Sequence, residues 1–268
     1  MNAGWAAAGD QEPRRHFGEW LVEQGEIVAA LISRDLKTRF SQNMFGYSWT
    51  FVLPVLWIAG TYGIFYVLNR TSPIFTDLVT FIISGLIPYV AFRYTVNAMG
   101  KVNGAVRSLI IFPGVTPEHA AIALAVVEYV NIYIVAAIIM AINYFVFGNF
   151  ELDNLPLWIG GITLAWLLGA GYGYLFSVLS RRDITVFQLG IILLRPSYFF
   201  SAVFFIPNEL RGDVLSVLGW NPLMHAIEIS RDGMLFHYQS RISDPLYVVA
   251  FIAVLFGAAL AVRAWRPI

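Results

Sequence analysis

Residues 34–68 read RDLKTRFSQNMFGYSWTFVLPVLWIAGTYGIFYVL, and the boundary inside this stretch decides how the chain folds. Four of its first six residues are charged, and the next charged residue is Arg70. An uncharged run of this length can cross a hydrocarbon core of about 30 Å as a helix that rises about 1.5 Å per residue. Charges are costly in hydrocarbon, so we expect the charged end to lie at one membrane surface while the rest spans.

The composition is that of an integral membrane protein. Of the 268 residues, 58% are hydrophobic and 13% are charged, whereas a soluble domain spends about a quarter of its residues on charged side chains. The chain has no cysteine, which excludes a disulfide, a thiolate nucleophile and a cysteine-ligated metal. Residues 1–33 lack the apolar core and the cleavage site of a signal peptide, so we expect the amino end to stay in the cytoplasm.

Apolar runs predict an all-α protein with six transmembrane helices. The expected spans are about 45–68, 77–98, 120–147, 157–180, 184–205 and 245–262. Residues 45–268 therefore form the transmembrane domain, and residues 1–15 are predicted to be a disordered tail. Between them, residues 16–44 have the pattern of an amphipathic helix that lies in the membrane interface or packs on a partner.

Two segments between the spans are too polar or too short to cross. Residues 101–119 are rich in glycine and proline and carry a core that could form a short helix. The apolar pieces within residues 207–230 are each shorter than a span, so they are predicted to be re-entrant or interfacial helices.

Six spans put both termini on one side, and the Lys and Arg residues identify that side. One side collects eleven of them: Arg14, Arg15, Arg34, Lys37, Arg39, Lys101, Arg107, Arg181, Arg182, Arg263 and Arg266. The other collects four: Arg70, Arg211, Arg231 and Arg241. The first side is predicted to be cytoplasmic.

The sequence shows no catalytic equipment. It has no phosphate loop of the form GxxxxGK[ST], no HExxH, and its four histidines are scattered. We therefore expect no catalytic residue, no metal site and no cofactor bound by this chain.

Two arginines lie inside predicted spans. Arg195 follows Asp183 by twelve residues, which puts it near mid-membrane, where a guanidinium costs at least about 2.5–3.5 kcal/mol. It must therefore meet a carboxylate, with Glu128 as one candidate, or an anionic substrate. Arg93 lies near the cytoplasmic end of its span, where a snorkelling side chain is the preferred interpretation and a channel role the alternative.

Polar and aromatic side chains also occur within the spans. Glu128, Asn131 and Asn143 share one helix face, which favours packing against protein or lining of a pore. Aromatic residues are dense in the first, second and fifth spans; for any single one a membrane-interface belt or the core is the preferred interpretation. Some could instead line a pore, because sugar rings stack on aromatic faces.

Several segments together resemble one family. LISRDLKTRF and GYSW in residues 31–49, GLIPYVAF (85–92), VRSLIIFPGVTP (106–117), LRPSYFFSAVFFIP (194–207) and WNPLMHAIEISRDGM (220–234) carry the likeness. In this order and spacing they resemble the membrane (permease) subunits of ABC-2 type capsular polysaccharide exporters, KpsM-like. The resemblance implies an ABC-2 (type V) exporter fold in the bacterial inner membrane, working as a homodimer.

The resemblance also implies partners. Each copy would bind a separate soluble ABC ATPase, which carries the ATP and Mg²⁺, through the amphipathic segment 16–44 and a coupling helix at about 103–117. Residues 207–230 would form gate helices on the outer side. The predicted contacts to the ATPase are Arg34, Asp35, Lys37, Arg39, Arg107, Ser108, Phe112, Pro113 and Thr116. The predicted substrate-channel residues are Arg93, Arg195, Tyr198, Trp49, Trp57, Tyr62, Glu128 and Asn131.

The sequence thus predicts the membrane subunit of an ATP-driven exporter of a lipid-linked acidic polysaccharide, with no nucleic acid bound. Periplasmic and outer-membrane export proteins are candidate further partners. The alternatives are export of another lipid-linked glycan, such as O-antigen or teichoic acid, and, in a different class, an ATP-independent transporter or a membrane glycosyltransferase subunit.

Overall fold

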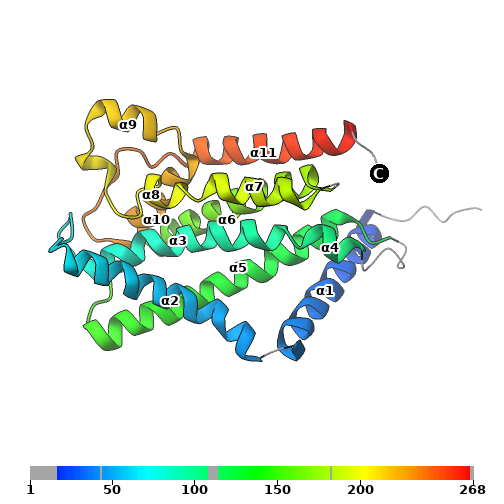
Figure 1. Ribbon diagram of the computed structural model, residues 1–268, viewed down its shortest axis with the longest axis horizontal. Coiled ribbons are helices and arrows are strands. Elements are labelled where there is room, and N and C mark those ends of the chain that lie inside the picture. The colour runs from blue at the N-terminus through cyan, green and yellow to red at the C-terminus, as the bar shows by residue number, and fades with distance from the viewer. Residues whose placement is uncertain (1–16, 43, 108–113, 182, 266–268) are drawn as a thin grey trace, which may run out of the picture.

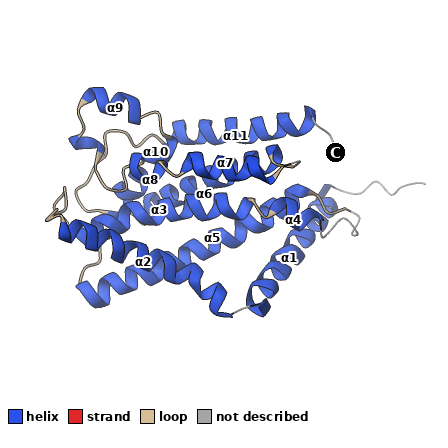
Figure 2. Cartoon of the chain, viewed as in Figure 1, coloured by secondary structure: helices blue, strands red, loops and turns tan. Residues whose placement is uncertain are grey.

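A computed structural model describes residues 17–42, 44–107, 114–181 and 183–265 of the protein. All regular structure in these ranges is helical, as Figure 2 shows. The elements are α1 (Phe17–Gln42), α2 (Met44–Val67), α3 (Leu78–Met99), α4 (Val102–Arg107), α5 (Pro117–Ile142), the π-helical η1 (Asn143–Phe147), α6 (Leu155–Leu179), α7 (Ile184–Leu194), α8 (Ser197–Phe200), the 3-10 turn η2 (Pro207–Glu209), α9 (Gly212–Leu218), α10 (Pro222–Met234) and α11 (Pro245–Trp265). The predicted tail, residues 1–15, lies outside the described residues.

Five helical stretches in the described ranges are long and apolar enough to cross a membrane. They are Gly46–Val67, Leu78–Ala105, Pro117–Phe147, Leu155–Leu179 and Pro245–Trp265. Their positions confirm five of the predicted spans to within a few residues, except that the second runs on through α4.

The predicted span 184–205 is wrong as a single helix. α7 has 11 residues and stops before Arg195-Pro196, and α8 is only one turn. Pro196 has no N–H to donate to the carbonyl four residues back, which removes a helical hydrogen bond at this point. Residues 201–206 are not helical, and Ala202 has a φ of 61°. Together α7 and α8 still return the chain from the end where α6 stops to the end where α11 begins (Figure 1).

The long helices run side by side along the long axis of the molecule (Figure 1). The start of α1, the helix α4 and the end of α11 lie at one end, and the α2–α3 loop and α9 lie at the other. α1 crosses that first end at an angle and packs on α5. The arrangement agrees with the prediction of a separate amphipathic helix before the first span, since α1 and α2 are distinct helices on either side of residue 43.

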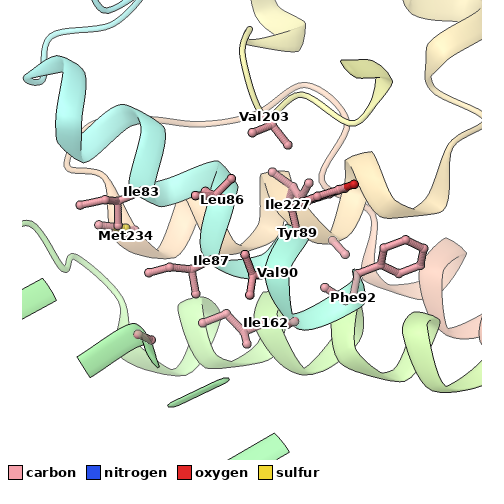
Figure 3. Packing of buried hydrophobic residues seen from close by; sticks show 14 of the residues in the cluster. Ile83, Leu86, Ile87, Tyr89, Val90, Phe92, Ile162, Val203, Ile227 and Met234 are labelled. Carbon is pink, nitrogen blue, oxygen red and sulfur yellow. The ribbon is translucent and has the colours of Figure 1, made fainter. Parts of the chain in front are cut away.

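The core is built around α3. In the span that contains it, 89% of the most apolar window is buried, against 22% in the windows of α2 and α11. α3 packs on α6, α5 and α10, and Figure 3 shows its Leu86, Ile87 and Val90 among Ile162 of α6 and Ile227 of α10. α2 and α11 are therefore peripheral helices with a large exposed apolar surface.

The predicted gate segment, residues 207–230, contains η2, α9 and most of α10. Nearly all of α10 is buried against α6, α3 and α11, although it is too short to span. Its close approach to α6 depends on glycine: a Cβ added at Gly161 would overlap the backbone of Ser230, and one at Gly233 would overlap the backbone of Trp158. α10 is thus an internal layer of the fold, while α9 lies at its exposed end (Figure 1).

Candidate functional site

Three aromatic side chains from α2, α3 and α8 meet on one side of the molecule. The rings of Trp57 and Tyr198 stack with centroids 5.5 Å apart, and Tyr89 lies 4.8 Å from Tyr198 and 6.0 Å from Trp57. Thr61, one turn after Trp57 on the same face of α2, lies 3.2 Å from the Tyr198 hydroxyl. We call Trp57, Tyr89 and Tyr198 the aromatic cluster; two of its members were predicted channel residues.

Two arginines lie beside the aromatic cluster. The guanidinium of Arg93 is 5.1 Å from the centre of the Trp57 ring, and its Nη1 donates to the Tyr89 hydroxyl at 3.5 Å. Arg93 and Arg195 line the same small cleft, together with Asn97. Arg195 is exposed where α7 ends, and neither arginine forms an ion pair within the described part of the chain.

This arrangement suits a particular chemistry. Aromatic faces can take the apolar face of a sugar ring, and arginine is the side chain best suited to bind carboxylate or phosphate in a planar, two-bond geometry. The cleft lined by Arg93 and Arg195 carries two positive charges and no carboxylate. It can therefore attract an anionic group that is carried next to a flat ring.

The other predicted channel residues lie elsewhere. Trp49 is 52% exposed near the start of α2. Tyr62 faces away from the aromatic cluster, stacking on Tyr66 with Phe147 nearby at 6.2 Å. The structure thus brings together four of the eight predicted channel residues, namely Arg93, Arg195, Tyr198 and Trp57.

Glu128 and Asn131 belong to a second group, which we call the Arg39 network: Asp35, Arg39, Tyr47, Glu128 and Asn131. Arg39 Nη2 lies 2.9 Å from Glu128 Oε1, and Arg39 Nε lies 2.6 Å from Asp35 Oδ2. Tyr47 donates to Asn131 at 2.7 Å, and Asn131 donates to Glu128 at 3.5 Å. The hypothesis that Glu128 pairs with Arg195 is wrong, because its partner is Arg39.

The Arg39 network also changes the expectation for α1. The side chain of Arg39 is 13% exposed and turns toward α5, so it does not lie on an outer surface with Arg34 and Lys37. Burial acts to lower the pKa of Arg39, but Glu128 and Asp35 outweigh it and raise the pKa above its usual value. Arg39 is therefore a fixed positive charge that joins α1 to the membrane domain.

The remaining predicted ATPase contacts gather around α4 and the start of α5. Thr116 caps α5 by accepting from the His119 backbone N–H, so its side chain serves the helix. Only the first part of the predicted coupling helix is described, as the six-residue α4, which ends at Arg107. Ser108, Phe112 and Pro113 lie outside the described residues. Near Thr116, His119 Nε2 is 2.7 Å from Gln24 Oε1 of α1.

Sequence reasoning missed a fully buried polar cluster around Arg231. Arg231 pairs with Glu228 and donates to Ser84 Oγ at 3.1 Å and to the Ala202 carbonyl at 2.7 Å. Tyr238 donates to Glu228 at 2.6 Å. Counting Arg231 as a surface residue was wrong. The spacing of Glu228 and Arg231 by three residues, in a helix with many apolar positions, was the signal that could have identified a buried pair.

The buried cluster positions the aromatic cluster. By holding the Ala202 and Phe205 carbonyls, Arg231 fixes the non-helical segment 201–206 against α3 and α10. Phe204 in that segment packs edge-on against Tyr198, with ring centroids 4.6 Å apart. A buried charge pair at 0% exposure therefore supports the exposed ring that stacks on Trp57.

Comparison with known proteins adds independent information. A family model described as ABC-2 type transporter matches residues 26–235. The chain is 32% identical to the polysialic acid transport protein KpsM of Escherichia coli, over 91% of this chain and 94% of that protein. It is also 25% identical to the O-antigen export system permease protein RfbA of Klebsiella pneumoniae, over 88% and 90%, and to the capsule polysaccharide export inner-membrane protein CtrC of Neisseria meningitidis, over 92% and 94%.

Proposed function

The chain belongs to the ABC-2 type transporter family, and from this premise we propose that it is the membrane subunit of an ATP-driven exporter of lipid-linked capsular polysaccharide. The observation that carries the proposal is the 32% identity to a polysialic acid transport protein over 91% of the chain. Polysialic acid is by its name a polyacid. The cleft between Arg93 and Arg195, beside the aromatic cluster, supports an acidic glycan as cargo.

A long polymer needs a continuous passage. The enclosed space near Arg93 and Arg195 is only about 20 Å³, which cannot hold even one sugar ring. We propose that the passage forms between two copies of the chain, with α2, α7 and α8 facing it. The low burial of the α2 span, 22% of its window, supports this because such a surface needs cover from lipid or from a second copy. Aromatic and polar lining would let a hydrated chain slide without a deep trap.

The energy would come from another protein. We propose two copies of a soluble ABC ATPase, carrying ATP and Mg²⁺, at the end of the molecule that holds α1 and α4. Arg34 and Lys37 are exposed on α1, and Lys101 is exposed before α4, which supports this end as the docking side. The protein would lie in the bacterial inner membrane with this end and both termini in the cytoplasm. In this scheme α7 and α8 make the sixth crossing, α9 and α10 form the outer gate, and periplasmic and outer-membrane export proteins continue the route.

Two measurements test the proposal. The purified chain should co-purify with a soluble ATPase, and vesicles that contain both should take up lipid-linked polysaccharide only when ATP is hydrolysed. Deletion of the gene should make a capsular glycan accumulate inside the cell. Transport or glycosyl transfer by the chain without any ATPase would overturn the proposal.

A second candidate keeps the mechanism and changes the cargo. The 25% identity to an O-antigen export permease over 88% of the chain favours O-antigen as the alternative lipid-linked glycan. The same deletion separates the two, because the glycan that accumulates in the cytoplasm identifies the cargo.

A further inference from the structure

The Arg39 network connects the helix outside the spans to the middle of α5. Arg39 stands near the end of α1, and Glu128 lies eleven residues into α5, so the ion pair joins residues 89 positions apart. The side chains of Arg39 and Glu128 are 13% and 7% exposed. This is therefore a sheltered contact between two elements and not a pair on one surface helix.

The same two helices also meet at the other end of α1. His119 Nε2 of α5 lies 2.7 Å from Gln24 Oε1 of α1. Between these contacts, Leu31 and Thr38 of α1 and Ala123 and Leu124 of α5 line one small cavity of about 150 Å³. α1 is thus attached to α5 along most of its length by one polar contact at each end and by side-chain packing between them.

Sliding α1 along α5 would expose the charges. Such a movement would separate Arg39 from Glu128 and leave a carboxylate near mid-helix without its cation, which is strongly unfavourable in a sheltered site. A movement in which α1 and α5 stay together breaks none of these contacts. The network also includes Tyr47 of α2, which donates to Asn131 of α5, and α2 carries Trp57 of the aromatic cluster.

From these contacts we propose that α1 and α5 move as one rigid body and that Arg39 and Glu128 are positioning residues, which pass a displacement of α1 to the channel wall. The proposal rests on the proposed function, since it takes the ATPase to be the source of the displacement. The charge pair works through geometry: it touches neither nucleotide nor cargo. Its loss should therefore separate ATP hydrolysis from export.

Glu128→Gln tests this in the complex with the ATPase, reconstituted in vesicles. Glutamine keeps the shape and removes the charge, so we expect a normal yield of complex and normal ATP hydrolysis, while glycan exported per ATP falls about tenfold, within the usual range for coupling between sites. Glu118→Gln is the matched control, because Glu118 is an α5 carboxylate whose partner, Arg263, lies on α11 and not on α1. It should leave export per ATP unchanged.

A double variant separates coupling from stability. Arg39→Met combined with Glu128→Gln removes both charges, so complex yield should match the wild type while export per ATP stays low. Unchanged export per ATP in Glu128→Gln, or a parallel fall in yield, hydrolysis and export, would overturn the proposal. If the wild-type complex shows no ATP-dependent export, the proposed function itself fails, and the positioning role fails with it.

Crosslinking tests the rigid body directly. The natural chain has no cysteine, so Gln24→Cys with His119→Cys introduces the only two thiols, one on each helix where their side chains now touch. A short bifunctional thiol reagent should join α1 to α5 without reducing export relative to the same variant before crosslinking. Loss of export on crosslinking would show that the two helices must move apart, and would overturn the proposal.

Discussion

Replacing Gly161 by alanine probes how closely α6 and α10 approach. A Cβ at this position would lie 2.6 Å from Ser230 Cα and 2.7 Å from Ser230 Cβ, and it would overlap the Ser230 backbone nitrogen. Ordinary contact begins at 3.4 Å, so the two helices would have to separate by about 0.8 Å. The obstructing atoms are mainly backbone, which means that no side-chain rotation can make room.

The cost follows from the position of α10. Overpacking a well-packed core costs about 1–3 kcal/mol, and we expect the upper half of this range because α10 is buried against α6, α3 and α11. Alanine regains about 0.5–1 kcal/mol over glycine inside a helix. The net loss should be about 1.5–2 kcal/mol, which corresponds to a fall in melting temperature of about 3–8 °C for a chain of this size.

The adjacent glycine supplies the control. Nothing lies within 4 Å of a Cβ built at Gly160, so Gly160→Ala gains helix propensity without a clash and should leave the melting temperature unchanged or raise it. Melting of both variants in the same detergent, followed by size-exclusion chromatography after heating, measures the difference. Equal melting temperatures for Gly161→Ala and Gly160→Ala would refute the close contact of α6 with α10.

Three further predictions follow from single contacts. Arg195→Ala should lower export while membrane insertion and co-purification with the ATPase stay normal, and Arg195→Lys should keep part of the export; wild-type export by the alanine variant would remove Arg195 from the substrate path. Thr116→Ala removes the N-cap of α5 and should cost about 0.5–2 kcal/mol in a melting experiment, and a melting temperature equal to that of Thr116→Ser would contradict the cap. Arg231→Met leaves Glu228 buried without its cation and should cost about 3–5 kcal/mol, seen as a low yield of folded protein. Adding Glu228→Gln should recover yield, and no recovery would argue against the charge as the cause.

Much of the fold could be predicted from local pattern. A run of about 20 uncharged apolar residues has few alternatives to a membrane-crossing helix, because hydrocarbon offers no partner to an open backbone. This is why the expected spans at 45–68 and 245–262 agree with helices at Gly46–Val67 and Pro245–Trp265. The break at Arg195-Pro196 was also visible in the sequence, but how the chain continues after it was not.

The buried polar contacts could not be predicted, because each depends on a distant partner. In the sequence, Arg39 is one of four charges close together and has the appearance of a solvated surface. Its main partner, Glu128, lies 89 residues away, and nothing local points to it. α10 has the same difficulty: Glu228, Arg231 and Asp232 suggest exposure, yet Glu228 and Arg231 satisfy each other inside the protein. Local composition reports the cost of burying a charge but not whether that cost is offset.

The arginines of this chain separate structural charges from functional ones. Arg39 meets two carboxylates, and Arg231 meets a carboxylate, a hydroxyl and backbone carbonyls, so the fold itself satisfies both. Arg93 and Arg195 line a common cleft and form no ion pair among the described residues, although both lie in apolar parts of the chain. A guanidinium is expensive to keep in such surroundings unless an anion compensates it. Since the folded chain does not provide that anion, the charge of Arg93 and Arg195 is best explained by a ligand that brings its own negative group, as an acidic glycan would.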